Sequence, residues 1–242
     1  MKVLVIPDIH LKPWIFDRAE EIMKAGKAER AVCLMDLPDD WNMGFQISLY
    51  EETFDRAIAW VKAYPDTLWC YGNHDVSYPW RKDETGYSTY AEHTVVMKLR
   101  ELEEELPRLS QIAIIHRIDK VLFMHGGLTD IFVRWQGDEF MKADIDEVIA
   151  MINDASRSDL WRNNSPLWFR PQYDKAKIFR AKEYKQVVGH TPVEKIYEEN
   201  GVISTDVFST KPNGEQIGES AMIVIDTETG EYEKIPVEGK PE

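Results

Sequence analysis

Cysteine is scarce in this chain of 242 residues, which contains only Cys33 and Cys70. Each of them comes three residues before a polar side chain, Asp36 or Asn73, and lies in an apolar run that is typical of a buried strand. We therefore expect two reduced thiols in the core. A disulfide or a structural zinc site would need more cysteines or a different compartment.

Positive charge is also in short supply, because 29 lysines and arginines face 43 aspartates and glutamates, for a formal charge of −14. Such a surface repels polyanions, so we expect no nonspecific binding to duplex nucleic acid. No apolar run is long enough to span a membrane. The apolar opening Met1–Ile6 stops at Pro7 and Asp8, too early for a secretory signal. The sequence predicts a cytoplasmic protein with no membrane partner.

The sequence lacks internal repeats and low-complexity tracts, and its 43% of hydrophobic residues suffice for one domain over residues 1–242. Continuous apolar runs predict strands, and patterned, charged segments between the first three predict helices. Alternation of this kind favours a parallel α/β sheet. Residues 131–180 have no strong strand pattern, and we interpret them as an inserted cap over the site. The strands expected are Lys2–Pro7, Ala31–Met35, Thr67–Tyr71, Gln111–His116, Lys120–Met124, Val187–Val188, Val202–Ser204, Ala221–Ile225 and Tyr232–Ile235.

Polar blocks follow several of these strands. They are Asp8-Ile9-His10, Asp36-Leu37-Pro38-Asp39, Gly72-Asn73-His74-Asp75, His125-Gly126-Gly127 and Gly189-His190. Ligands of open α/β sheets bind beyond the carboxyl ends of the strands, where side chains from separate segments converge. Carboxylate, imidazole and amide groups suit Mn, Fe or Zn ions, and two such ions can clamp the oxygens of a phosphoryl transfer. The blocks therefore predict a two-metal site.

Together the blocks resemble those of the calcineurin-like metallophosphoesterases. The segments Gly72–Asp75, His125–Leu128 and Val188–Pro192 are most similar to the phosphoprotein phosphatase branch, with its bacterial serine/threonine phosphatases and symmetrical diadenosine tetraphosphatases. The resemblance spans Asp8 to about Asp226. It implies a four-layer α/β/β/α sandwich and a hydrolase that uses two divalent metal ions, among which manganese is favoured.

The resemblance also implies a role for each matching residue. Asp8 and His10 would hold the first metal, and Asp36 would bridge both. The second metal would be held by Asn73, His125 and His190. His74 would act as the general acid, Asp39 would orient it, and a hydroxide bridging the two metals would attack. No Gly-x-Ser-x-Gly segment exists, so a Ser-His-Asp hydrolase of the nucleophile-elbow type is excluded.

Two positions depart from the family pattern. Met35 stands where relatives usually have glycine before the bridging aspartate, and Asp40-Trp41 replaces an arginine and a glycine. Phosphate recognition must then come from elsewhere or be altered. Arg170 is the best replacement, and Arg162 and Arg81 are weaker candidates. Trp14 and Trp41 directly follow ligand blocks, so we expect them to wall the cleft and to stack on a substrate ring.

These observations predict hydrolysis of phosphomonoesters, on a phosphoserine or phosphothreonine protein or on a small nucleotide. A phosphodiesterase or dinucleoside polyphosphate hydrolase on the same fold is one alternative. A binding scaffold with little turnover is another, favoured only by the replacement of Arg-Gly.

Overall fold

Three parallel strands form the centre of the first sheet. β1 (Lys2–Ile6), β2 (Arg30–Cys33) and β3 (Leu68–Cys70) pair side by side, and α1 (Trp14–Lys24) and α2 (Ile47–Ala63) connect them. The computed structural model describes residues 1–239. β1 and β3 lie within the ranges that their apolar runs predict, and β2 begins one residue before its predicted range. A strand buried on both faces has no polar alternation to blur its ends.

The first sheet is completed by segments from the middle and the end of the chain. β4 (Ile112–Ala113) pairs in parallel with β3, whereas β10 (Ala221–Asp226) pairs antiparallel with β1 and carries β11 (Tyr232–Pro236). The strand order is β11-β10-β1-β2-β3-β4. Turns at Gly214 and Gly230, which the sequence predicts, have positive φ angles of 82° and 73°.

The second sheet has the order β5-β6-β7-β9-β8. Its strands are β5 (Ile115–Ile118), β6 (Val121–Met124), β7 (Lys185–Val188), β8 (Tyr197–Glu199) and β9 (Val202–Ser204). β6, β7 and β9 are parallel, and β5 and β8 pair antiparallel at the two edges. β5 and β6 form a hairpin.

One predicted strand, Gln111–His116, is wrong as a single element. Its first part is β4 in the first sheet and its second part is β5 in the second sheet, so the chain changes sheets at Ile114. The side chain of Asn153 stabilises this crossing, because its Oδ1 accepts hydrogen bonds from the backbone N–H groups of Ile114 and Ile115 at 3.1 and 2.9 Å.

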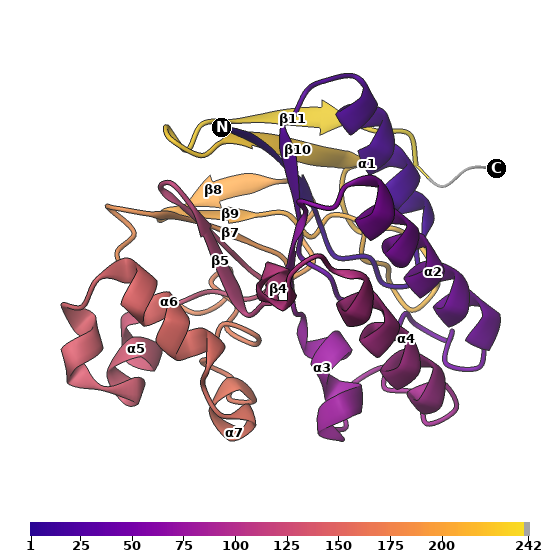
Figure 1. Cartoon of the computed structure of the whole chain (residues 1–242), viewed down its shortest axis with the longest axis horizontal. Coiled ribbons are helices and arrows are strands. Elements are labelled where there is room, and N and C mark those ends of the chain that lie inside the picture. The colour runs from indigo at the N-terminus through magenta and orange to yellow at the C-terminus, as the bar shows by residue number, and fades with distance from the viewer. Residues whose placement is uncertain (240–242) are drawn as a thin grey trace.

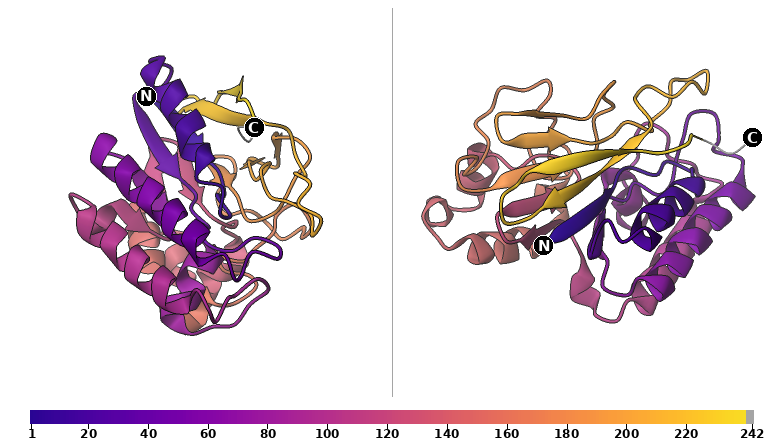
Figure 2. Two further views of the ribbon diagram at one scale, coloured as in Figure 1. Left: turned by 90° about the vertical axis from the view of Figure 1, so that its right-hand side faces the viewer. Right: turned by 90° about the horizontal axis from the view of Figure 1, so that it is seen from above.

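The two sheets pack face to face between two layers of helices. Side chains of β6 alternate, so that Val121 and Phe123 join the core shared with the first sheet, and Leu122 and Met124 join the core under the second helical layer. On one side lie α1, α2 and α4 (Glu92–Glu105), which run side by side in the left view of Figure 2. On the other side lie α5 (Asp130–Gln136), α6 (Ile145–Asn153) and α7 (Arg157–Leu160) (Figure 1). The four-layer α/β/β/α fold is confirmed.

Two segments bear on the site. Pro79 and Gly86 predict a loop over residues 76–86, but this range begins within a helix, α3 (Asn73–Trp80). That prediction is wrong because Pro79 sits near the end of the helix and does not prevent its first turns. Residues 131–180 hold α6 and α7, and Leu167 and Phe169 in this range belong to the core of the second sheet. Whether the range is an inserted cap stays a prediction.

Among the described residues, no helix is long and apolar enough to cross a membrane.

Candidate metal centre

The polar blocks meet at one edge, where the carboxyl ends of strands from both sheets come together. Asp8, Asp36 and Asn73 follow β1, β2 and β3, and His125 and His190 follow β6 and β7. The two sheets are joined there, because the backbone N–H of His190 donates to Asp8 Oδ2 at 2.7 Å. The convergence that the sequence predicts is therefore present in the fold.

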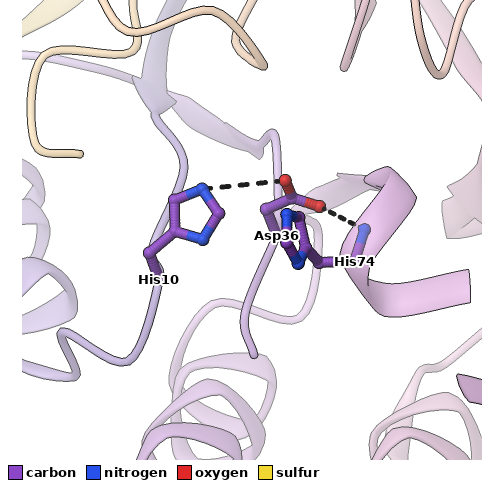
Figure 3. Close-up of side chains that lie close together, drawn as sticks. All are labelled: His10, Asp36 and His74. Carbon is purple, nitrogen blue, oxygen red and sulfur yellow. Dashed lines mark hydrogen bonds and ion pairs between the residues drawn. The ribbon is translucent and has the colours of Figure 1, made fainter. Parts of the chain in front are cut away.

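Asp36 occupies the middle of this edge. Its Oδ2 lies 3.0 Å from Nε2 of His125 on one side and 3.7 Å from Nε2 of His10 on the other. Its Oδ1 accepts a hydrogen bond from the backbone N–H of His74 at 2.9 Å. Figure 3 shows the carboxylate between His10 and the start of the helix that carries His74. A single carboxylate placed this way can contact two neighbouring cations.

On one side of Asp36, ligand atoms crowd around the Nε2 atom of His125. Asn73 Oδ1 lies at 2.9 Å and His190 Nδ1 at 3.1 Å, in addition to Asp36 Oδ2. One imidazole nitrogen carries at most one proton, so hydrogen bonds cannot satisfy all these contacts. The opposite nitrogens are held by carbonyls, His125 Nδ1 by Leu34 and His190 Nε2 by Trp168. If the nitrogens that face the carbonyls carry the protons of neutral rings, the inward nitrogens and the amide oxygen form the donor set of a divalent cation.

On the other side stand Asp8 and His10. The Nδ1 atom of His10 lies 2.8 Å from the carbonyl of Asp39, so its Nε2 atom is free to face Asp36. Asp8 is fully buried, and its Oδ1 has no hydrogen-bond partner among the described residues. Burial raises the pKa of Asp8 well above its ordinary value, and the charge of Asp206 raises it further. A buried carboxylate oxygen without a hydrogen-bond partner can serve as a ligand of a second cation.

His74 is held by two carboxylates. Its Nδ1 lies 2.9 Å from Asp39 Oδ2 and 3.3 Å from Glu84 Oε1. Burial lowers the pKa of His74, but the charges of Asp36, Asp39 and Glu84 outweigh it and raise the pKa to about 10. Asp39 is itself fixed, because the hydroxyls of Tyr50 and Tyr78 both donate to its Oδ1. A protonated imidazole next to the metal edge can donate to a departing oxygen.

The backbone at the site is unusually bent. Met35 and Asp36 have φ angles of 56° and 45°, and His10 and His190 have 44° and 64°. Non-glycine residues seldom adopt this left-handed region, and such strain gathers at functional sites. Glycine before the bridging aspartate would adopt it freely, which accounts for the family pattern, and here a fully buried Met35 adopts it instead.

Sequence reasoning missed three acidic residues of this site. Asp75 accepts from the backbone N–H groups of Asp36, Leu37 and Gly72, so it ties the second and third blocks together. It is the last residue of the Gly72–Asp75 block and could have been found there. Asp206, fully buried and two residues beyond β9, has no motif signal. Glu84 lies in a loop that appears featureless in sequence.

The proposed substrate residues lie around this edge. Arg170 is half-buried, and its Nη1 donates to the carbonyl of His190 at 2.6 Å and contacts Thr191 Oγ1 at 3.3 Å. Arg162 instead lies over the ring of Trp135 and pairs with Asp159 at 3.4 Å. The structure therefore brings Arg170, and not Arg162, against a residue of the candidate metal centre.

A groove of about 1080 Å³ begins next to the same edge. Trp14 and Trp41 line it, together with Lys12 and Asp40. Asp40 pairs with Lys12 at 2.7 Å, so the negative charge that replaces the family arginine is compensated within the protein. A second cavity, of about 990 Å³, is lined mainly by residues 171–183. None of the proposed metal ligands lines either the groove or this cavity.

Comparison with known proteins agrees with this geometry. The family model described as "Calcineurin-like phosphoesterase" matches residues 1–217. The chain belongs to the calcineurin-like phosphoesterases. It is thus a hydrolase of a family that uses divalent metals and acts on phosphorylated substrates, and its His and Asp clusters can bind such ions. The branch within the family stays a prediction.

The solved structures that this chain resembles are distant in sequence. A cold-active protein-tyrosine phosphatase of a psychrophilic Shewanella species is 18% identical, with a TM-score of 0.58 over 96% of this chain and 80% of that one. An I115M mutant of a cold-active protein tyrosine phosphatase is 19% identical, with a TM-score of 0.54 over the same shares. A novel archaeal phosphodiesterase is 15% identical, with a TM-score of 0.38 over 98% of this chain and 100% of that one. A search of curated proteins found no sequence match.

Proposed function

We propose that this member of the family is a two-metal phosphomonoesterase. Asp8 and His10 hold one ion, Asn73, His125 and His190 hold the other, and Asp36 contacts both. The observation that carries the proposal is the position of Asp36 Oδ2, which has His125 on one side and His10 on the other. Oxygen and imidazole donors in this ratio suit manganese, iron or zinc, and we favour manganese.

When bound, the two ions would activate water for attack and offset the negative charge of the phosphoryl group. His74 would donate its proton to the leaving oxygen, since Asp39 and Glu84 favour its protonated form. Tyr50 and Tyr78 hold Asp39 in place, so the imidazole keeps one orientation during the transfer. This assignment needs no protein nucleophile.

Arg170 is proposed to bind the phosphate. Within the described residues only its Nη1 atom donates to the protein, so Nε and Nη2 remain for two phosphate oxygens. The organic part of the substrate would lie in the groove, against Trp14 and Trp41. Trp41 is 46% exposed, which is typical of a ring that a substrate covers and not of a core tryptophan.

For the substrate we propose a phosphoprotein or a small nucleotide, in the cytoplasm. The Shewanella protein of the same fold is a protein-tyrosine phosphatase, so phosphotyrosine joins phosphoserine and phosphothreonine among the residues to test. Phosphodiesters and dinucleoside polyphosphates remain the alternative substrates. The pairing of Asp40 with Lys12 removes the main reason to expect a scaffold without turnover.

A substrate panel with Mn²⁺ tests the proposal. The metal-stripped protein is reconstituted and assayed on p-nitrophenyl phosphate, bis-p-nitrophenyl phosphate, phosphopeptides and a dinucleoside polyphosphate. We expect hydrolysis of the monoesters, abolished by chelation and by Asp36→Asn. Faster hydrolysis of the diester or the dinucleoside polyphosphate would show that the substrate belongs to that class and not to the phosphomonoesters. Activity in Asp36→Asn equal to that of the natural protein would refute the two-metal assignment.

A further inference from the structure

Glu84 is a buried carboxylate in the loop between α3 and α4. Its side chain is 5% exposed, although the loop around it, from Arg81 to Thr85, is otherwise exposed. No lysine or arginine of the described residues pairs with it. A buried carboxylate is costly unless its partners repay the loss of water. The identity of those partners therefore indicates what Glu84 does.

One partner is the amide of Asn73. Its Nδ2 donates to Glu84 Oε2 at 2.5 Å, while Oδ1 on the opposite side of the same amide faces His125. An asparagine amide can flip by half a turn, which exchanges its donor and its acceptor. A carboxylate accepts hydrogen bonds and cannot donate one, so Glu84 selects the orientation in which the oxygen faces the metal edge.

The other partner is His74. Glu84 Oε1 lies 3.3 Å from its Nδ1 and has no other contact within the described residues. Asp39 already accepts from the same nitrogen, so Glu84 adds charge and not a second hydrogen bond. The two oxygens of Glu84 thus contact two consecutive residues, one a proposed metal ligand and the other the proposed acid.

Contacts of the loop with the rest of the protein hold Glu84 in this position. Gly86 has a φ of 98°, and a Cβ there would lie 3.4 Å from both Asp39 Cβ and His74 Cε1, so the backbone packs directly over the imidazole. Ser88 fixes the far end, because its backbone N–H donates to the hydroxyl of Tyr78 at 3.0 Å. The side chain of Glu84 is therefore placed by a packed loop.

We propose that Glu84 is a positioning residue that sets the amide of Asn73 for the second metal and braces His74 beside it. The inference rests on the proposed two-metal function. Partners of this kind that orient a ligand typically contribute about 10–100-fold to metal affinity. Loss of Glu84 should therefore weaken the second ion, held by Asn73, more than the first, held by Asp8 and His10.

The test is a calorimetric titration with Mn²⁺ alone, without substrate, on the full chain stripped of metal. Glu84→Met keeps the length of the side chain but accepts no hydrogen bond, whereas Glu84→Gln keeps one carbonyl oxygen for Asn73. Asp83→Asn changes the neighbouring exposed acid and is the matched control. We expect Glu84→Met to weaken the second Mn²⁺ by at least about tenfold. Glu84→Gln should recover most of that loss, and Asp83→Asn should bind as the natural protein does.

Two-site binding in Glu84→Met that equals the natural protein would overturn the inference. Failure of Glu84→Gln to bind better than Glu84→Met would do the same. The inference is also overturned if the natural protein binds three Mn²⁺ ions and Glu84→Met binds two. Asp39, His74 and Glu84 would then be metal ligands themselves. If Glu84→Met does not fold, Glu84→Ala takes its place in the comparison. A natural protein that binds no Mn²⁺ would instead refute the proposed function, and this inference with it.

Discussion

Each proposed ligand atom faces the site because the other polar atom of its side chain is already bonded. His10 Nδ1 and His190 Nε2 meet carbonyls, and the Asn73 amide nitrogen meets Glu84. Such outer partners fix tautomers and orientations before any ion binds. The orientation of the ligand atoms therefore depends on backbone carbonyls as well as on the motif residues.

Replacing His74 separates acid catalysis from metal binding. His74→Asn should lower kcat by about 10²–10⁴-fold on alkyl phosphates, whose leaving oxygen needs a proton. Aryl phosphates should lose less, because their leaving groups are stable without one. Steady-state kinetics on both ester types, with metal content measured alongside, checks this. Parallel loss of metal and activity would show that His74 is a ligand.

Arg170 provides a second residue-scale prediction. Arg170→Ala should raise KM for phosphomonoesters and lower kcat, since the charge that the guanidinium meets persists in the transition state. A loss of about 10–100-fold in kcat/KM corresponds to the 1.5–3 kcal/mol typical of a hydrogen bond to a charged group. Arg162→Ala is the control, because Arg162 lies over Trp135. Equal effects of the two substitutions would remove Arg170 from the site.

The sequence predicts the residues that lie in motifs and misses those that reach the site through tertiary packing. All six proposed ligands come shortly after a strand or at the start of a helix, so their convergence could be inferred from the sheet alone. Glu84 and Asp206 come from segments without periodicity, and only the packing of distant elements brings them to His74 and Asp8. The ion pair of Asp40 with Lys12 also forms through tertiary packing and has no signal in the sequence.

Elements buried on both faces were the easiest to predict. β1, β2 and β3 appear as unbroken apolar runs, and α1 and α2 lie in the charged segments between them that predict helices. The failures have a common cause, since local sequence does not show which sheet a strand joins. The run from Gln111 to His116 is divided between the sheets, and β8, exposed at an edge and rich in glutamate, has no apolar signal.

His116 links the two sheets, because its Nε2 lies 3.1 Å from the carbonyl of Trp69 in β3. Burial lowers its pKa from 6.5 to about 4. Between these values the unfolded chain binds a proton that the folded chain does not. The contribution of the neutral His116 ring to the free energy of unfolding is therefore complete above about pH 6.5. It falls as the pH drops toward 4, by up to about 3 kcal/mol.

Urea unfolding from pH 7 to pH 4, with EDTA present, tests this contribution. The natural protein should lose stability over this range more steeply than His116→Gln, which has no titrating ring but keeps a donor for Trp69. His93→Gln, a change of an exposed histidine on α4, is the matched control. Curves for the natural protein and His116→Gln that stay parallel from pH 7 to pH 4 would contradict the prediction.

At the scale of the whole molecule, buried aspartate side chains are concentrated where the two sheets meet. Asp8, Asp36, Asp75 and Asp206 are all at most 1% exposed, and no lysine or arginine of the described residues forms an ion pair with any of them. Like charges buried together destabilise a fold unless protons or cations offset them. The native state without metal should therefore be less stable than the metal-bound state.

Divalent metal should consequently stabilise the entire domain. Binding to the folded state alone adds about 2.7 kcal/mol when the ion is at a hundred times its Kd. For a chain of 242 residues this corresponds to a rise in Tm of roughly 5–11 °C. Calorimetric scans with Mn²⁺ and with EDTA measure it, and Asp36→Asn should lose most of the rise because both ions are proposed to contact that carboxylate. A Tm that is the same with and without Mn²⁺ would mean that the acids are held by protons, and that the edge is not a metal centre.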